Sequence, residues 1–298
     1  LEPVHFMPDD SIMCLNAFVR AKGRGTDIYR ASTWAELEGK VSDICYGNSS
    51  VSDISLSGNL KNNHLLAEII SAYPLIKGRI SIDGDVKKKE VNGMLIVDVD
   101  TLDLYGLRLT ETPLATSFQL FSEVASDLDK AHSLDVTLGN WSLMFEKQTI
   151  QPKMLTLGFR SNADTVRGSF HAGDLDIMMT GNADLNTLAN KLSYLSGELG
   201  KQLKRDSMVN IQELRPEFPD MSIQVNAERD NPIYNFMQEY NMFFETLDLN
   251  ATISPEEGLN VNGTLLSLVK DTLKIDTIRL NIWQDTLGLQ YEADVAKN

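Results

Sequence analysis

Apolar and polar residues alternate along most of this chain. In "KIDTIRLNIWQDTLGLQYEADV", residues 274–295, apolar side chains occupy every second position on both sides of a break at Gln284-Asp285. This period of two residues is typical of a β-strand with one buried face and one solvent-exposed face. Two such runs around a short polar break predict a β-hairpin. The same alternation marks "DISLSGNL", "GRISIDGDV", "SLDVTLGN", "MLTLGFR" and "GDLDIMMTG".

Turn residues divide these runs into hairpins. The segment "GRISIDGDVKKKEVNGMLIVDVDTLDL" predicts a hairpin that turns at "KKKEVNG". The segment "TSFQLFSEVASDLDKAHSLDVTLGNW" predicts another that turns at "DLDKAH", with a helix over residues 118–128 as the alternative. Gly, Asn and Asp interrupt the runs about every eight to twelve residues, which is the spacing of all-β proteins.

Three segments change to a helical spacing of apolar residues. We expect helices near residues 62–73, 184–204 and 232–245. The second carries a leucine stripe at three- and four-residue steps. The third begins with Asn231 as an N-cap and Pro232 in the first turn. The chain is therefore predicted to be mainly β, with antiparallel strands and about three amphipathic helices packed on the sheet.

The chain is expected to form one continuous β-rich segment over residues 1–298, with a possible boundary near residues 205–218. It opens on Leu1 and not on Met, so we expect it to be a piece of a longer protein. Missing targeting or membrane-spanning segments then say nothing about its compartment. The net charge of −15 repels phosphate backbones, so nucleic acid is not an expected partner.

Two cysteines, Cys14 and Cys45, are too few for a disulfide scaffold. Both lie in apolar, strand-like contexts. Two buried, reduced thiols are therefore the favoured interpretation, and a single disulfide between them is the alternative.

Sequence motifs give little support for catalysis. The four histidines are not spaced as metal ligands, and no nucleophile elbow, Walker loop or dinucleotide-binding loop is present. Asp98 and Asp100 lack the glycine and distal glutamate of a calcium loop, so we assign them to the wet face of a strand. We assign Asp174 and Asp176 in the same way. No enzyme activity, metal or cofactor is expected, and a hydrolase would need His171 or His132 beside an acid such as Asp174.

Apolar side chains on many successive strands allow two interpretations. They form either a closed sandwich or barrel core beneath the helices, or a partly open trough that suits a lipid tail. The trough would be lined by the inward-facing residues of the clearest strands, namely Leu134, Val136, Leu138, Leu155, Leu157, Phe159, Ile278, Leu280, Ile282, Leu287 and Leu289.

Several long segments resemble one protein family. They are "GMLIVDVDTLDLYGLRLTETPLATSFQLFSEV", "HSLDVTLGNWSLMF", "SFHAGDLDIMMTG", "RDNPIYNFMQEYNMFF" and "DTLKIDTIRLNIWQDTLGLQYEADV". Together they are similar to TamB-type proteins of the Gram-negative envelope, within the AsmA-like group. The resemblance extends from about Leu60 to Asn298.

The resemblance implies a fold, a cellular location and a function. Such proteins are anchored at the inner membrane, extend across the periplasm and curl their sheet into a taco-like groove with an apolar lining. They are implicated in moving phospholipid between the two membranes and in assisting outer-membrane protein assembly with an Omp85-family partner. The partner-docking C-terminal domain has no match here. We therefore expect a non-enzymatic segment that guides phospholipid acyl chains, and the alternative is a scaffold with a closed β core that binds no lipid.

Overall fold

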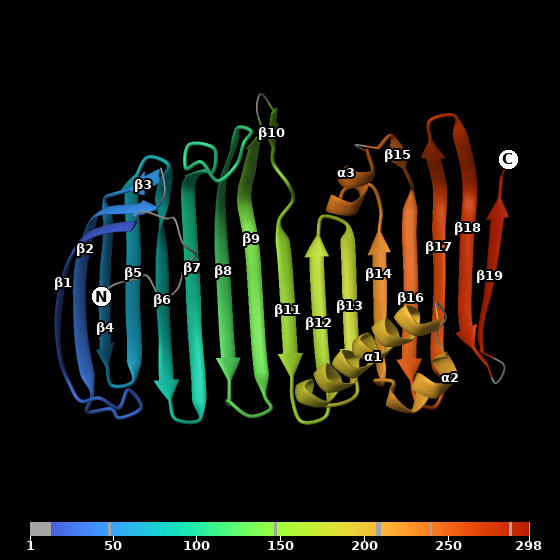
Figure 1. Ribbon diagram of the computed structural model, residues 1–298, viewed down its shortest axis with the longest axis horizontal. Helices are drawn as coiled ribbons and strands as arrows, with labels where there is room; N and C mark the ends of the chain where they lie inside the picture. The colour runs from blue at the N-terminus through green and yellow to red at the C-terminus, as the bar shows by residue number, and fades with distance from the viewer. Residues whose placement is uncertain are drawn as a thin grey trace. The chain divides into compact units, whose positions relative to one another are not determined.

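The computed structural model describes residues 13–46, 49–145, 148–206, 210–238, 240–285 and 288–297 (Figure 1). The fold is mainly β, with antiparallel strands in an open sheet and three α-helices, as the alternation predicts. Contacts divide the chain into two units: unit 1 is Leu1–Leu128 with Val136–Met154, and unit 2 is Asp129–Asp135 with Leu155–Asn298. The segment 205–218 lies inside unit 2.

Unit 1 is built from long hairpins. Its strands are β1 (Met13–Arg24), β2 (Trp34–Tyr46), β3 (Ser49–Val51), β4 (Ile54–Lys61), β5 (His64–Tyr73), β6 (Ile76–Lys87), β7 (Glu90–Asp103), β8 (Leu114–Ser126), most of β9 (His132–Phe145) and β10 (Gln148–Ile150). The strands β1, β2, β4, β5, β6, β7 and β8 pair antiparallel in that order. The short strands β3 and β10 pair with β2 and β9.

Unit 2 combines a second run of antiparallel strands with all the helices. Its strands are β11 (Leu155–Ser161), β12 (Val166–Ala172), β13 (Leu175–Gly181), β14 (Met221–Ala227), β15 (Met242–Phe243), β16 (Thr246–Ser254), β17 (Gly258–Lys270), β18 (Leu273–Gln284) and β19 (Leu289–Ala296). Its helices are α1 (Leu185–Asp206), α2 (Ile211–Leu214), the 3₁₀ turn η2 (Arg215–Glu217) and α3 (Pro232–Gln238). Strand β14 pairs with β13 on one side and with β16 on the other. The chain forms α1, α2 and η2 between β13 and β14, and α3 between β14 and β15.

Two of the three helix predictions need correction. The helix expected at 184–204 is confirmed as α1, but the helix expected at 232–245 ends at Gln238 and is followed by β15. The prediction over 62–73 is wrong, because this segment forms the β4–β5 turn and strand β5. Asn62 and Asn63 adopt positive φ values of 54° and 65°, which bring the two strands into a tight hairpin.

The apolar residues of β5 explain that error. Leu65 and Ile69 lie on one face of the strand, and Leu66 and Ile70 lie on the other. A strand with apolar residues on both faces produces the same spacing as one face of a helix. The alternative helix over 118–128 is also wrong, because most of that segment belongs to β8, and the hairpin is confirmed.

The core of unit 2 lies at the two ends of its strands. Under α3, the buried side chains of Tyr234 and Phe244 pack against Leu175 and Ala227, with the two aromatic rings edge to face at 5.2 Å. At the opposite strand ends, a second core joins α1 and α2 to the sheet through the buried residues Leu195, Leu214 and Phe218. Figure 1 shows α1 lying obliquely across the lower ends of the strands and α3 near their upper ends.

Asp174 holds the loop that begins α3. Its carboxylate accepts hydrogen bonds from the backbone N–H groups of Glu228 (3.1 Å) and Asp230 (2.7 Å) and from the amide of the buried Asn231 (2.6 Å). Asn231 in turn caps α3 by accepting a hydrogen bond from the Tyr234 N–H at 2.9 Å. Asp174 is therefore a turn residue that anchors a helix. The sequence-based assignment of Asp174 to the solvent-exposed face of a strand is wrong.

Lowering the pH should weaken the hydrogen bonds by which the Asp174 carboxylate holds the start of α3. Burial raises the pKa of Asp174, but the hydrogen bonds from Asn231, Asp230 and Glu228 outweigh it and hold the pKa below its ordinary value. The resulting stabilisation is fully present above the unfolded value of about 3.9 and is lost as the pH falls through the lower folded value. We expect Asp174→Asn to lower the melting temperature at pH 7, with a smaller difference from wild type at pH 3. A difference that stays constant over this range would contradict the assignment.

Candidate functional site

The strand register assigns apolar residues of unit 1 to a single face of the sheet. Directly opposed residues share a face, so the pairs can be followed from strand to strand. One transverse row contains Gly39, Leu56, Ile69, Ile80, Val97 and Leu120, and the next contains Leu37, Gly58, Ala67, Ile82, Leu95 and Ser122. We call the surface that these rows form the unit 1 apolar face.

The unit 1 apolar face carries no charged side chain among the paired residues of β1, β2 and β4 to β8. Its only polar groups there are hydroxyls, such as those of Ser71 and Ser122. Charged side chains from the same strands project from the opposite face. This separation makes the sheet amphipathic across its thickness.

No second layer covers the unit 1 apolar face in the part of the chain that is described. The described part of unit 1 contains no helix, and its only buried apolar side chains are Val41 and Leu107. Ile69, Ile80 and Ile82 lie in the middle of the sheet and are still 43%, 37% and 40% exposed. Apolar side chains this accessible in the centre of a sheet are available to an apolar ligand.

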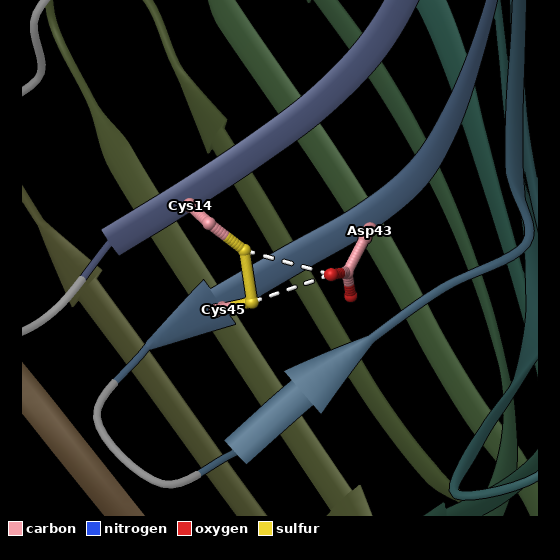
Figure 2. Close-up of side chains that lie close together, drawn as sticks. All are labelled: Cys14, Asp43 and Cys45. Atoms are coloured by element: carbon pink, nitrogen blue, oxygen red, sulfur yellow. Dashed lines mark hydrogen bonds between the residues drawn. A yellow bond between two sulfur atoms is a disulfide. The ribbon is translucent and has the colours of Figure 1, made fainter.

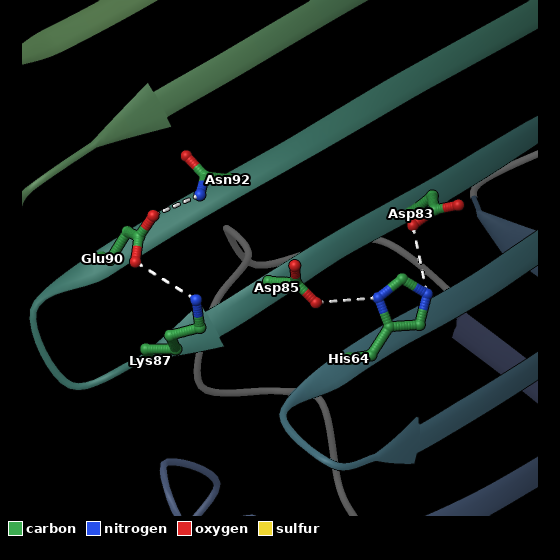
Figure 3. Close-up of polar contacts among 6 residues, drawn as sticks. All are labelled: His64, Asp83, Asp85, Lys87, Glu90 and Asn92. Atoms are coloured by element: carbon green, nitrogen blue, oxygen red, sulfur yellow. Dashed lines mark hydrogen bonds and ion pairs between the residues drawn. The ribbon is translucent and has the colours of Figure 1, made fainter.

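The opposite face of unit 1 is held by polar contacts (Figure 3). His64 lies between two carboxylates, with Nδ1 2.9 Å from Asp85 and Nε2 3.3 Å from Asp83. At the β6–β7 turn, Glu90 accepts hydrogen bonds from Asn92 and Lys87, and these bonds lower the pKa of Glu90. These are exposed or half-buried polar contacts of the kind found on solvated surfaces.

Unit 2 also has one apolar face, and its helices lie over the strand ends, where Phe170, Ile177 and Val225 pack against the edge of the core beneath α3. Its two middle rows contain Phe159, Gly168, Met179, Ile223, Ala251, Val261 and Ile282, and Leu157, Phe170, Ile177, Val225, Leu249, Gly263 and Leu280. Every residue of these rows is half-buried or exposed, whereas the residues beneath α1 and α3 are buried. We call these two rows the unit 2 apolar face.

Most of the predicted lining residues lie on apolar faces. Leu157, Phe159, Leu280 and Ile282 belong to the unit 2 apolar face, and Leu155, Ile278 and Leu289 lie at its margins on the same side of the sheet. Leu134, Val136 and Leu138 are half-buried on β9, the first in unit 2 and the others in unit 1. Leu287 is outside the described residues. The structure does not gather these residues into one cluster, because five strands separate β11 from β18.

The prediction missed the largest part of the apolar surface. It drew no lining residue from β4 to β8, which supply most of the unit 1 apolar face. It also overlooked a group of glycines on that same face, namely Gly23, Gly39, Gly58, Gly78, Gly84 and Gly93. The signal was present in the sequence, since each glycine has the parity of the apolar residues. At Gly58 and Gly93 the nearest atoms to an added Cβ would lie 3.6 Å and 3.5 Å away, so these two glycines leave the backbone accessible to a ligand, whereas the side chain of Leu56 already lies over Gly39.

Cys14 and Cys45 form a disulfide between β1 and β2, with a Cα–Cα distance of 4.8 Å (Figure 2). The favoured prediction of two buried, reduced thiols is therefore wrong, and neither residue is fully buried. The two positions lie directly opposite each other in the β1–β2 register, which long-range pairing decides and local sequence does not. A carboxylate oxygen of Asp43 lies 3.3 Å and 3.5 Å from the two sulfurs.

The candidate catalytic and metal-binding groups do not assemble into a site among the described residues. His171 contacts Asp176 across the strands and not Asp174, which anchors α3. Asp98 lies opposite Arg79, and Asp100 forms an ion pair with Lys77 at 3.1 Å. In the described ranges, Cys14, Asp43 and Cys45 are the one group of such side chains spaced closely enough for a metal ion, but the two cysteine sulfurs are joined in the disulfide and carry no thiolate.

Comparisons of the chain with protein-family models, curated proteins and solved structures returned no match. The family resemblance therefore remains a prediction from the quoted segments. In the described residues no helix combines the length and the apolar character required to cross a membrane.

The two kinds of apolar position should differ in their contribution to stability. Leu280 is 37% exposed on the unit 2 apolar face, whereas Phe244 is 2% exposed beneath α3. We expect Leu280→Ala to lower the free energy of unfolding by less than about 2 kcal/mol and Phe244→Ala to lower it by about 3–5 kcal/mol. Urea denaturation followed by circular dichroism measures both values. Equal losses would show that Leu280 is covered in solution.

Proposed function

We propose that this chain is a non-enzymatic, TamB-like envelope segment that guides phospholipid acyl chains along the apolar faces of its sheet. The supporting observation is the unit 1 apolar face, which spans successive strands, carries no charged residue in its paired positions and remains accessible. A closed β core would instead place such side chains out of contact with water.

The chemistry of this face suits an acyl chain. Each methylene transferred from water to an apolar surface is favourable by about 0.8 kcal/mol, so partial burial of ten methylenes contributes several kcal/mol. Because the face offers hydroxyls but no charge, it provides no fixed point for a headgroup. An acyl chain can therefore move from one row to the next without breaking a strong polar contact.

The dimensions of the rows also suit an acyl chain. Neighbouring strands lie about 4.8 Å apart, so the row from Gly39 to Leu120, which crosses six strands, extends about 24 Å. This length is comparable with that of an extended phospholipid acyl chain. Gly58 and Gly93 on the same face leave room for the acyl chain to approach the backbone.

The disulfide supports an oxidising compartment. Bonds such as Cys14–Cys45 persist in the periplasm and are rare in the cytosol. We therefore propose a periplasmic location, within a longer protein that is anchored at the inner membrane. Support for outer-membrane protein assembly through an Omp85-family partner belongs to the same proposal, and it would use parts of the protein outside this chain.

The proposed function predicts that the purified protein carries phospholipid. We expect Ile80→Asp in unit 1 or Leu280→Asp in unit 2 to reduce the bound phospholipid several-fold, because a carboxylate placed in an apolar row raises the cost of burying methylenes there. The matched controls are Ser81→Asp and Asn281→Asp, which place the same charge one residue along, on the opposite face. Lipid extraction with mass spectrometry measures the bound amount.

Circular dichroism checks that each variant remains folded. Equal lipid content in all four variants would contradict binding at the apolar faces. Absence of lipid from the wild-type protein, together with no uptake from phospholipid vesicles, would favour the scaffold that binds no lipid.

A further inference from the structure

One group of side chains combines the donor atoms of a metal site with redox chemistry. Cys14 on β1 and Cys45 on β2 lie directly opposite each other, and Asp43 precedes Cys45 by two residues on the same strand. The two sulfurs and a carboxylate oxygen of Asp43 all lie within 4.8 Å of one another. Two cysteine sulfurs and a carboxylate oxygen are ligand types that Zn²⁺ takes in proteins.

The three side chains project from the polar face of unit 1. Leu15 and Ile44 oppose each other on the apolar side, so the residues next to them in each strand face the other way. Figure 2 shows the Asp43 carboxylate directed at both sulfurs. Cys14, Asp43 and Cys45 are each half-buried, so both a reductant and a metal ion from solvent can reach them.

The carboxylate already has the spacing of a zinc ligand relative to both sulfurs. One oxygen of Asp43 lies 3.3 Å from the Cys45 sulfur and 3.5 Å from the Cys14 sulfur. With Zn–S bonds of about 2.3 Å and Zn–O bonds of about 2.0–2.2 Å, a tetrahedral angle separates sulfur from oxygen by about 3.5 Å. Only the two sulfurs would need to separate, to about 3.8 Å, once the bond between them is broken.

The charge around this group also favours a cation. Asn16 lies directly opposite Asp43 on β1, and Ser50 lies directly opposite Cys45 on β3, so the opposed positions are neutral. Two thiolates beside the Asp43 carboxylate would repel one another at these distances unless a cation lay between them. A divalent cation removes this repulsion, because all three negative groups become its ligands.

We propose that reduction of the Cys14–Cys45 disulfide opens a binding site for a zinc-type divalent cation, with both cysteine sulfurs and Asp43 as ligands and water in the fourth position. A dithiol reductant supplies the two electrons and two protons that convert the disulfide into two thiols, and the reductant is itself oxidised to a disulfide. Metal binding then releases both thiol protons to solvent.

The disulfide form and the metal form exclude each other, because they use the same two sulfurs. In either form a link joins β1 to β2, so the pairing of these strands is held in both redox states. The site lies on the polar face and not on the unit 1 apolar face, so this inference does not depend on lipid binding.

Cobalt titration tests the site, because Co²⁺ bound by thiolates absorbs in the near ultraviolet and Co²⁺ bound by carboxylates alone does not. We expect protein reduced with a phosphine under nitrogen to bind one Co²⁺ per chain with this absorption, and added Zn²⁺ to displace it. The disulfide-bonded protein should show no such absorption. An excess of Mg²⁺, which prefers oxygen ligands, should leave the signal unchanged.

Substitutions separate this site from other carboxylates on the surface. Asp43→Asn keeps both thiols and should weaken Co²⁺ binding at least about tenfold, since even indirect partners of metal ligands typically contribute 10–100-fold. Cys14→Ser leaves a single thiol and should lose at least half of the near-ultraviolet absorption. The matched control is Asp98→Asn, which removes a carboxylate opposite Arg79 on the same face and should bind Co²⁺ like the wild-type protein.

Four results would overturn the proposal. The first is reduced, folded wild-type protein that gives no thiolate absorption with Co²⁺. The second is equal affinity in the wild-type protein and Asp43→Asn, which would show that the carboxylate is not a ligand. The third is equal Co²⁺ affinity in the oxidised and reduced proteins, which would assign binding to surface carboxylates. The fourth is loss of the folded circular dichroism spectrum on reduction that Zn²⁺ does not restore.

Discussion

The structure depends on apolar side chains staying on the same face of the sheet from one strand to the next, through every hairpin. A shift of one residue in the register of any strand would move its apolar side chains to the polar face of the sheet. Two irregularities in unit 1 preserve the parity. One extra residue, Ser42, separates Val41 from Asp43 in the β1–β2 register, and a second, Asp100, lies between Val99 and Thr101 opposite β6. Each bulge absorbs one residue, so that Ile44 and Leu102 return to the apolar side.

The two units differ in how far helices cover the apolar face of the sheet. In unit 2, the helices cover the ends of the apolar face and create two small cores, and Asp174 and Asn231 fix α3 in place. In unit 1 the corresponding face has no helix over its described residues, and the buried apolar side chains described there are Val41 and Leu107 alone. Cores beneath helices thus distinguish unit 2 from the described part of unit 1.

The alternation in the sequence was sufficient to predict the mainly β fold, the hairpins and the side of the sheet on which Leu157, Phe159, Leu280 and Ile282 lie. These are local properties of a strand with two faces. The pairing of Cys14 with Cys45 and the anchoring of α3 by Asp174 could not be predicted, because both depend on contacts between distant segments. The helix expected at 62–73 failed since β5 carries apolar residues on both faces. The glycines of unit 1 were overlooked because a glycine adds no apolar side chain to the alternation, although each has the parity of its apolar neighbours.

The apolar faces are defined by the parity of positions and not by particular side chains. Gly, Leu and Ile occur together in both transverse rows of the unit 1 apolar face, with Val in one row and Ala in the other, and none of these apolar side chains can form a hydrogen bond that a substitution would break. Such a surface tolerates exchange among its larger apolar residues, whereas a Cβ added at Gly39 would lie 2.8 Å from the side chain of Leu56. The amino-acid identities at these larger apolar positions can therefore change widely while the apolar character of the face is kept.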